Sequence, residues 1–143
     1  MPTLVLDRAA QPAQGASGNP AGLFHGVLHP EDGAHARLGR AAAWMAQRHY
    51  GPLIEAGQLA GQAQGLLRLL EDTCPGELQA LIDALGLPPE YAQACSAEQV
   101  AALLAMPSVN PQSACRFMGG GWIDPGAWVR WALGRATVQF QGG

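Results

Sequence analysis

The apolar positions of this chain recur mostly at helical spacing. Between Pro30 and Tyr50 they fall three and four residues apart, at Ala34, Leu38, Ala41, Ala42 and Met45. This spacing places them on one side of a helix, and a proline followed by two acids is typical of a helix start. Gly51-Pro52 is expected to end the helix. Its other side carries Arg37, Arg40, Trp44, Gln47 and Arg48.

A second helix is expected from Pro52 to Asp72. It would hold three glycines four residues apart, Gly57, Gly61 and Gly65. Each costs about 1 kcal/mol relative to alanine inside a helix, so close approach of another helix should offset the loss. We therefore interpret the glycines as a shallow docking groove. The alternative is that they reflect an Ala/Gly-rich composition and that the helix breaks near Gly61.

Start and stop signals predict four further helices, over residues 76–85, 88–95, 97–106 and 111–118, and a last one over 125–135. Ser96 and Gln99 form a capping box for one of them. Thr3–Leu6 and Thr137–Phe140 are extended runs at opposite ends of the chain. Because chain ends often lie close together, they are expected to pair as a two-stranded ribbon. The alternative is addition to the edge of a neighbouring subunit.

The predicted fold class is therefore all-α, a compact bundle of five to seven mostly short helices with irregular crossing angles. Residues 1–22 are expected to form an extended N-terminal segment, and residues 23–143 a single helical domain. A length of 143 residues with 48% hydrophobic content suits one domain with a real core. The richness in alanine and leucine favours helices over sheets.

The net charge of −3 argues against a nucleic-acid partner. The sequence has no apolar run of 18 residues and no basic, apolar leader, so we expect no membrane partner and a cytoplasmic protein, or one incorporated into an assembled particle. Cys74, Cys95 and Cys115 are widely spaced without a C-x-x-C pair. They are expected to be reduced and mostly buried, although Cys74 lies at a helix start, where a thiol becomes more reactive.

The contact-forming residues suggest a partner protein or self-association. Trp and Arg are enriched where proteins bind each other, which singles out two further groups beside the glycines. The partner-binding candidates are Gly57, Gly61, Gly65, Trp44, Arg40, Arg48, Trp128, Trp131 and Arg135.

Catalytic motifs are absent from the sequence: it has no Walker loop, no H-E-x-x-H, no G-x-S-x-G and no nucleotide-binding glycine fingerprint. We therefore expect a non-enzymatic structural or adaptor subunit of a larger assembly, such as a virion, tail or secretion complex, with no cofactor and no metal. One alternative is a small metal-binding or enzymatic module that uses His25 and His29, which have helical ligand spacing. Another is a target-blocking regulator or immunity protein.

Overall fold

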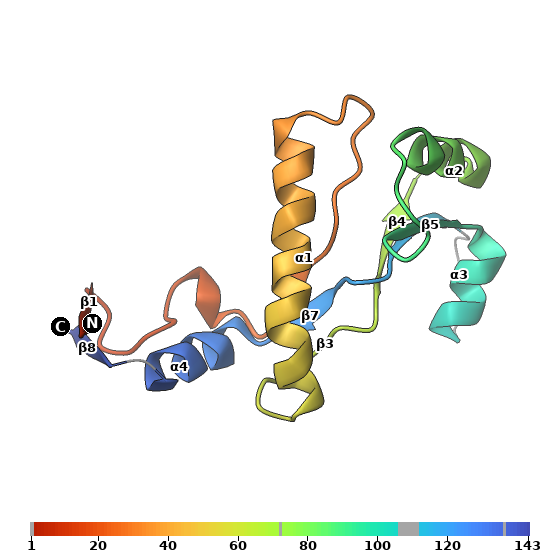
Figure 1. Ribbon diagram of the computed structural model, residues 1–143. Helices are drawn as coiled ribbons and strands as arrows, with labels where there is room; N and C mark the ends of the chain where they lie inside the picture. The colour runs from red at the N-terminus through yellow and green to blue at the C-terminus, as the bar shows by residue number, and fades with distance from the viewer. Residues whose placement is uncertain (1, 72, 106–111, 136) are drawn as a thin grey trace. The chain divides into compact units, whose positions relative to one another are not determined.

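The computed structural model describes residues 2–71, 73–105, 112–135 and 137–143, and these form a mixed α/β structure (Figure 1). The expected all-α class is therefore wrong. The described helices are α1 (Ala34–Glu55), α2 (Pro75–Ala84), α3 (Ala97–Leu104) and α4 (Pro125–Arg135), with a short 3-10 helix η1 (Ala16–Gly18). The strands are β1 (Thr3–Asp7), β2 (Gly22–Phe24), β3 (Gly61–Gln62), β4 (Leu66–Leu70), β5 (Ala92–Cys95), β6 (Ser113–Phe117), β7 (Gly121–Ile123) and β8 (Val138–Gly142).

The chain gathers into two units, each made of segments that are far apart in sequence. Unit 1 comprises Met1–Leu23, Arg48–Ala63 and Trp122–Gly143. Unit 2 comprises Phe24–Gln47 and Gln64–Gly121. The expected division after residue 22 stays a prediction.

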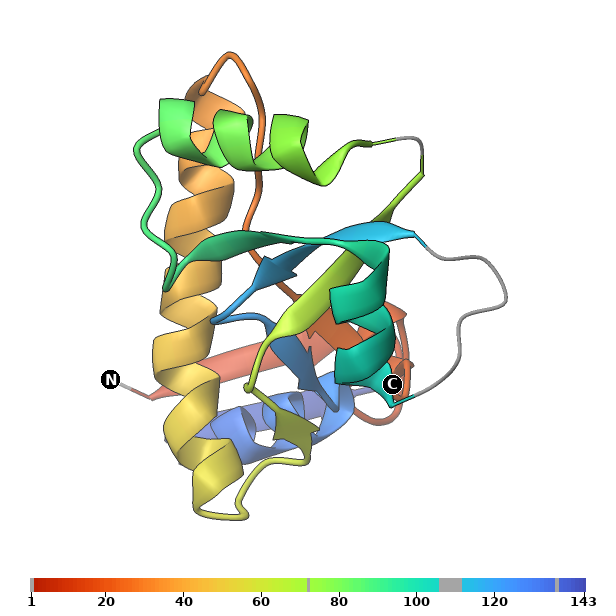
Figure 2. The same ribbon diagram turned by 90° about the vertical axis from the view of Figure 1, so that its right-hand side faces the viewer.

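Unit 2 is built on a three-stranded antiparallel sheet in the order β4-β6-β5. Successive side chains of a strand point to opposite faces, so β6 contributes side chains to a hydrophobic cluster on each face of the sheet. Cys115 and Phe117 pack with Leu78 and Ile82 of α2, whereas Ala114 packs with Val100 of α3. Figure 2 shows α2 and α3 beside this sheet. The alternation along β6 thus explains why both helices can bury an apolar side.

Unit 1 contains the two ends of the chain, which pair as parallel strands. β1 and β8 run in register from Thr3↔Val138 to Asp7↔Gly142. Parallel neighbours need a crossover connection, commonly a helix, and α4 directly precedes and contacts β8. The two extended runs expected from the sequence therefore do pair. Unit 1 also holds the antiparallel pairing of β3 with β7.

The expected glycine helix over residues 52–72 is wrong. α1 continues through Gly51 and Pro52 to Glu55, and the chain then turns at Gly57, whose φ is +66°. Gly65 also has a positive φ, +114°, a backbone conformation that glycine adopts most readily. Gly61 lies in β3, where a Cβ atom would meet the Trp122 carbonyl oxygen and lie 3.1 Å from Ile123 Cα. The glycines serve turns and strand pairing, so they do not line a groove along a helix; a partner-binding role for Gly57, Gly61 and Gly65 stays a prediction.

Two other expected helices are strands in the structure. Residues 92–95 form β5 and residues 113–117 form β6, both buried in the sheet of unit 2. The first residue of the helix expected over 111–118 falls outside the described residues. The helices over 76–85, 97–106 and 125–135 are confirmed as α2, α3 and α4, and the Ser96–Gln99 capping box is present. Among the described residues, no helix has the length and apolar character needed to cross a membrane.

Candidate functional site

The carboxyl ends of β1 and β8 meet at one edge of unit 1, because the two strands are parallel. Asp7 ends β1 opposite Gly142 of β8. An open hollow of about 350 Å³ lies there. It is lined by Leu6, Asp7, Arg8, Gln141, Gly142 and Gly143. In open α/β sheets, ligands bind outside the carboxyl ends of parallel strands, so this hollow is a candidate binding site.

The backbone shapes this hollow as much as the side chains do. The Ala9 N–H donates to Asp7 Oδ1 over 3.0 Å, which turns the chain just after β1. A Cβ atom on Gly142 would meet the Ala9 carbonyl oxygen and lie 2.8 Å from Ala10 Cα. Only glycine lets these two backbones approach so closely. The Asp7 carboxylate remains exposed and accepts hydrogen bonds, as a sugar hydroxyl requires.

Unit 2 holds a second cluster, centred on Tyr91. The Val27 N–H donates to the Tyr91 hydroxyl over 3.1 Å, and the Tyr91 ring meets the Phe117 ring edge-on at 6.0 Å. His25 packs on the same Phe117 ring, with centroids 5.4 Å apart. Burial raises the pKa of Tyr91, although the Val27 hydrogen bond and the Arg40 charge oppose the rise. Tyr91 is therefore a protonated hydroxyl at neutral pH, suited to donate a hydrogen bond.

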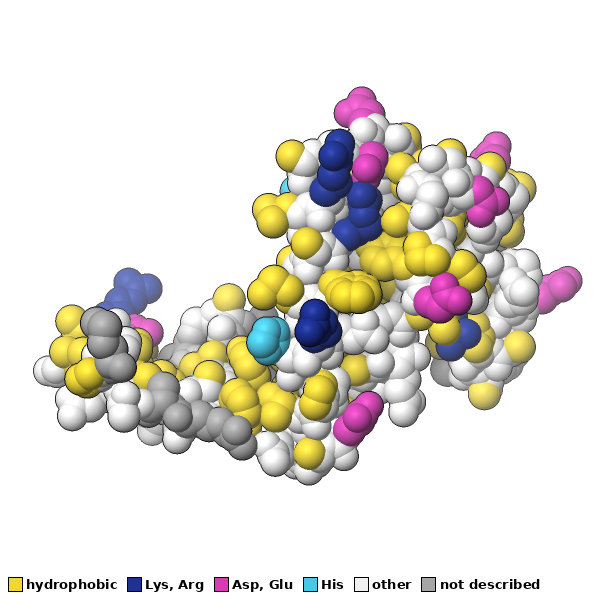
Figure 3. All heavy atoms as spheres, in the orientation of Figure 1, with side chains coloured by type: hydrophobic (Ala, Val, Ile, Leu, Met, Phe, Trp, Pro, Cys, Tyr) yellow, Lys and Arg dark blue, Asp and Glu magenta, His cyan; other side chains and the backbone are white. Residues whose placement is uncertain are grey.

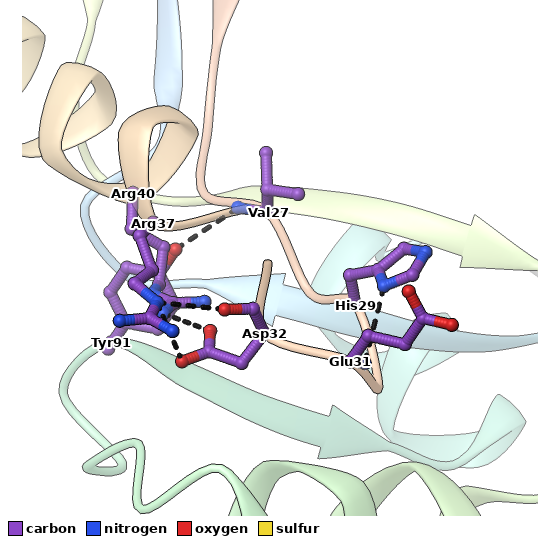
Figure 4. A network of polar contacts seen from close by, with 7 residues as sticks. All are labelled: Val27, His29, Glu31, Asp32, Arg37, Arg40 and Tyr91. Atoms are coloured by element: carbon purple, nitrogen blue, oxygen red, sulfur yellow. Dashed lines mark hydrogen bonds and ion pairs between the residues drawn. The ribbon is translucent and has the colours of Figure 1, made fainter. Parts of the chain in front are cut away.

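Asp32 joins two arginines of α1 at this cluster (Figure 4). Arg40 Nη2 contacts Asp32 Oδ1, and Arg37 Nε lies 3.5 Å from Asp32 Oδ2. Arg37 Nε also donates to the Asp32 carbonyl oxygen over 2.8 Å. The Arg40 side chain is 17% exposed and that of Arg37 is 70% exposed, so Arg40 points inward and Arg37 faces solvent. Arg40 Nη1 is buried with no hydrogen-bond partner in the described structure.

The structure distributes the predicted partner-binding residues over both units. Trp128 and Trp131 stack in α4, with ring centroids 5.0 Å apart, and Tyr50 meets Trp128 edge-on. Arg135 is the last residue of α4, and its side chain is outside the described part. Trp44 and Arg48 are exposed on α1. A partner-binding role for these residues stays a prediction.

The expected thiols and histidines also have defined places. Cys95 and Cys115 are buried free thiols, whereas Cys74 is exposed at the start of α2. His29 Nδ1 accepts the Glu31 N–H over 3.3 Å, and His25 Nδ1 lies 2.6 Å from the Gly26 carbonyl oxygen. In the described parts of the chain, no three His, Cys, Asp or Glu side chains are placed to hold a metal ion together.

Sequence reasoning missed Asp7 and Tyr91. The signal for Asp7 is an acidic residue directly after the apolar run Thr3–Leu6, which becomes informative once a parallel neighbour is known. Tyr91 has no such signal, because its partner Val27 is 64 residues away in sequence.

Comparison with known proteins identifies relatives over almost the whole chain. A family model described as "FAD dependent oxidoreductase" matches residues 2–141. A "tRNA 5-methylaminomethyl-2-thiouridine biosynthesis bifunctional protein MnmC" from Methylibium petroleiphilum is 41% identical over 141 residues, 97% of this chain and 21% of the relative. Proteins of the same name from Paraburkholderia phytofirmans and Azoarcus sp. are 37% identical over 84% and 33% identical over 88% of this chain, which are 18% and 19% of the relatives. The chain thus spans about a fifth of the length of the curated relatives it matches.

These matches overturn several expectations. A non-enzymatic structural subunit, whether of a virion, tail or secretion complex, is contradicted by a family of oxidoreductases. The exclusion of nucleic acid is contradicted by relatives named for a tRNA nucleoside. The sequence lacks a nucleotide-binding glycine fingerprint, so that motif does not reveal the family. The family model nevertheless matches residues 2–141. The chain belongs to the FAD dependent oxidoreductase family.

Proposed function

We propose that this chain forms part of a flavin-dependent oxidoreductase that modifies tRNA in the cytoplasm. The family match over residues 2–141 supports the oxidoreductase part. The relatives, named for biosynthesis of a thiouridine of tRNA, support the substrate class and a cytoplasmic site of action. Incorporation into an assembled particle has no support among them.

One observation carries the proposal: the hollow at the carboxyl ends of β1 and β8, with Asp7 at its edge. An acidic residue at the end of a parallel strand is suited to accept hydrogen bonds from ribose hydroxyls of a dinucleotide. The close backbone approach at Gly142 holds the segment after β1 against the end of β8, beside this hollow. These features fit the adenosine end of FAD.

The fit is limited to that end. A pyrophosphate is commonly bound by a glycine-rich turn at a helix N-terminus, and this sequence lacks the corresponding fingerprint. We therefore assign Asp7 and the strand ends of β1 and β8 to the adenosine, and no described residue to the phosphates. FAD, when bound, supplies the capacity to accept two electrons from a substrate. The residues assigned here contribute binding and orientation.

Competition binding with the 143-residue chain tests this assignment. Fluorescence of FAD is titrated with the protein, and ADP or FMN is then added as competitor. ADP should displace FAD and FMN should not, because only ADP carries the adenosine. Asp7→Asn should weaken FAD binding about tenfold or more, since hydrogen bonds to charged groups contribute about 1.5–3 kcal/mol.

Glu98→Gln is the matched control, because Glu98 is an exposed carboxylate of α3 in unit 2. Its FAD affinity should equal that of the unmodified chain. Absence of FAD binding up to about 1 mM would contradict the proposal, as would displacement by FMN but not by ADP.

A further inference from the structure

The solvent-facing side of α1 within unit 2 carries an aromatic ring beside a cation. The Trp44 side chain is 60% exposed, and that of Arg37 is 70% exposed. Seven residues are close to two helical turns, so both side chains leave α1 on the same side, with exposed Ala41 between them. Figure 3 shows arginine and hydrophobic side chains together over α1. We call Arg37, Ala41 and Trp44 the Arg37–Trp44 face.

We propose that the Arg37–Trp44 face binds unpaired RNA bases, with Trp44 as the stacking platform and Arg37 contacting a phosphate. This inference rests on the proposed function, which supplies tRNA as the substrate class. Proteins bind unpaired bases by stacking them on aromatic rings, and they follow the backbone with cationic side chains. An indole left 60% exposed is available for such stacking.

The charges on α1 itself agree with an anionic partner, whereas the carboxylates of Asp32 and Glu90, from neighbouring segments, border the face. α1 contains three arginines, and its one carboxylate, Glu55, is at the far end of the helix. Asp32 holds the inward-pointing Arg40, whereas Arg37 contacts Asp32 through Nε and still exposes most of its side chain. Because the whole chain has a net charge of −3, we expect few phosphate contacts and a binding energy dominated by stacking.

The surface beside Trp44 also offers hydrogen-bonding groups. A small hollow of about 20 Å³, roughly the space of one water molecule, is bordered by Trp44, Gln47, Glu90 and the glycine backbone at 119–120. The Gln47 amide lies against Gly119, since a Cβ atom there would lie 2.7 Å from Gln47 Cδ. Amide and carboxylate groups next to a stacking ring can bond the edges of a stacked base.

The competing reading is that α1 docks an apolar protein segment. Leu38 and Met45, next to the Arg37–Trp44 face, are 70% and 61% exposed. A bound protein segment would bury these aliphatic side chains, so truncating them would weaken the binding of that segment. RNA stacking depends on the ring and the cation instead. Met45→Ala is therefore the variant that separates the two readings.

The test measures RNA binding by the full chain with fluorescence anisotropy of a labelled oligouridine, with an unmodified tRNA transcript as competitor. Trp44→Ala should bind about tenfold more weakly, and Trp44→Phe should retain most of the affinity because it keeps a stacking ring. Arg37→Ala should reduce the steepness of the salt dependence by about 0.7 in log–log slope, the loss of one phosphate contact on a single strand. Met45→Ala should bind like the unmodified chain, and all variants should bind FAD equally.

Three results would overturn the inference, and they separate it from the proposed function. If the chain binds the tRNA transcript and Trp44→Ala binds it equally well, the Arg37–Trp44 face is wrong while a tRNA substrate stands. If Met45→Ala weakens RNA binding as much as Trp44→Ala does, base stacking on Trp44 is not what holds the RNA, and the inference is wrong. If the unmodified chain binds neither RNA, the tRNA part of the proposed function falls with it, whereas FAD binding still tests the flavin part.

Discussion

Gly26 occupies a position where a single methyl group should displace the Tyr91 cluster. A Cβ atom at this position would contact the Tyr91 hydroxyl, and it would lie 2.6 Å from Tyr91 Cζ and 2.8 Å from Phe117 Cδ1. Phe117 is 2% exposed at the centre of unit 2 and cannot move aside freely. Gly26→Ala must therefore shift the Tyr91 ring and break the hydrogen bond from the Val27 N–H.

The expected cost follows from these contacts. Overpacking of a core costs about 1–3 kcal/mol, and the lost hydrogen bond about 1 kcal/mol. The lower entropy of an unfolded chain with alanine offsets about 0.4–1 kcal/mol. The net destabilisation should be about 2 kcal/mol, a fall in Tm of about 4–8 °C for a chain of this size.

Urea unfolding followed by tryptophan fluorescence and circular dichroism measures this loss. Gly134→Ala is the matched control: the same change in the last turn of α4, where a Cβ atom meets nothing within 4 Å. It should stabilise the chain by about 0.5–1 kcal/mol because alanine favours helix. If Gly26→Ala proves as stable as the unmodified chain, the packing described around Tyr91 is refuted.

Two further predictions concern pH and helix capping. Burial raises the pKa of the Cys115 thiol from 9.0 to about 12, so above pH 9 the unfolded chain releases a proton that the folded chain keeps. The free energy of unfolding should therefore fall as pH rises from 9 towards 12, by about 1.4 kcal/mol per unit at most for this thiol, and urea titrations of Cys115→Ala should show a shallower decline. Identical slopes for the two proteins would argue against a buried, neutral Cys115. Ser96→Ala should lower the free energy of unfolding by about 1 kcal/mol in the same assay, because it removes the cap bond from the Gln99 N–H. Ser17→Ala, in the short helix η1, is the control and should cost less. Equal losses would count against the capping box.

The sequence predicts those elements whose signals are local. The α3 capping box, the Pro75 start of α2 and the Asp124 cap of α4 each lie within a few residues of the helix they start. The extended terminal runs are also local, and their pairing followed from the closeness of chain ends. These signals depend on backbone groups near the residue itself, and at these three helices tertiary context does not override them. At residues 92–95 and 113–117 it does, because strand pairing replaces the predicted helices.

The central errors arose where tertiary pairing decides the structure. The run Leu66–Leu70 is apolar except for Arg68, and its pattern fits a helix or a buried strand equally well until β6 pairs with it. Three glycines would be costly inside a helix, as the sequence indicates. Strand contact at Gly61 and positive φ at Gly57 and Gly65 account for glycine at these positions without a docking partner. α1 passes through Pro52 because proline removes a single helical hydrogen bond near its exposed end.

The candidate site was hidden for a related reason. The role proposed for Asp7 depends on pairing with a parallel strand more than 130 residues away in sequence. The Tyr91 cluster likewise joins segments that are 64 residues apart. Composition misled as well, because a net charge of −3 describes the whole chain and not the arginines of α1. Motif searches for phosphate loops could not find a site that presents a carboxylate at a strand end.

An NMR titration of the isotopically labelled chain with ADP tests the central claim most directly, because it reports where the adenosine of FAD would bind. The account predicts saturable shifts of the Asp7, Ala9 and Gly142 backbone amides, with the amides of β4, β5 and β6 unchanged, and a midpoint at about tenfold or more higher ADP concentration in Asp7→Asn. Shifts confined to unit 2, or none at the ends of β1 and β8 at saturating ADP, would contradict it.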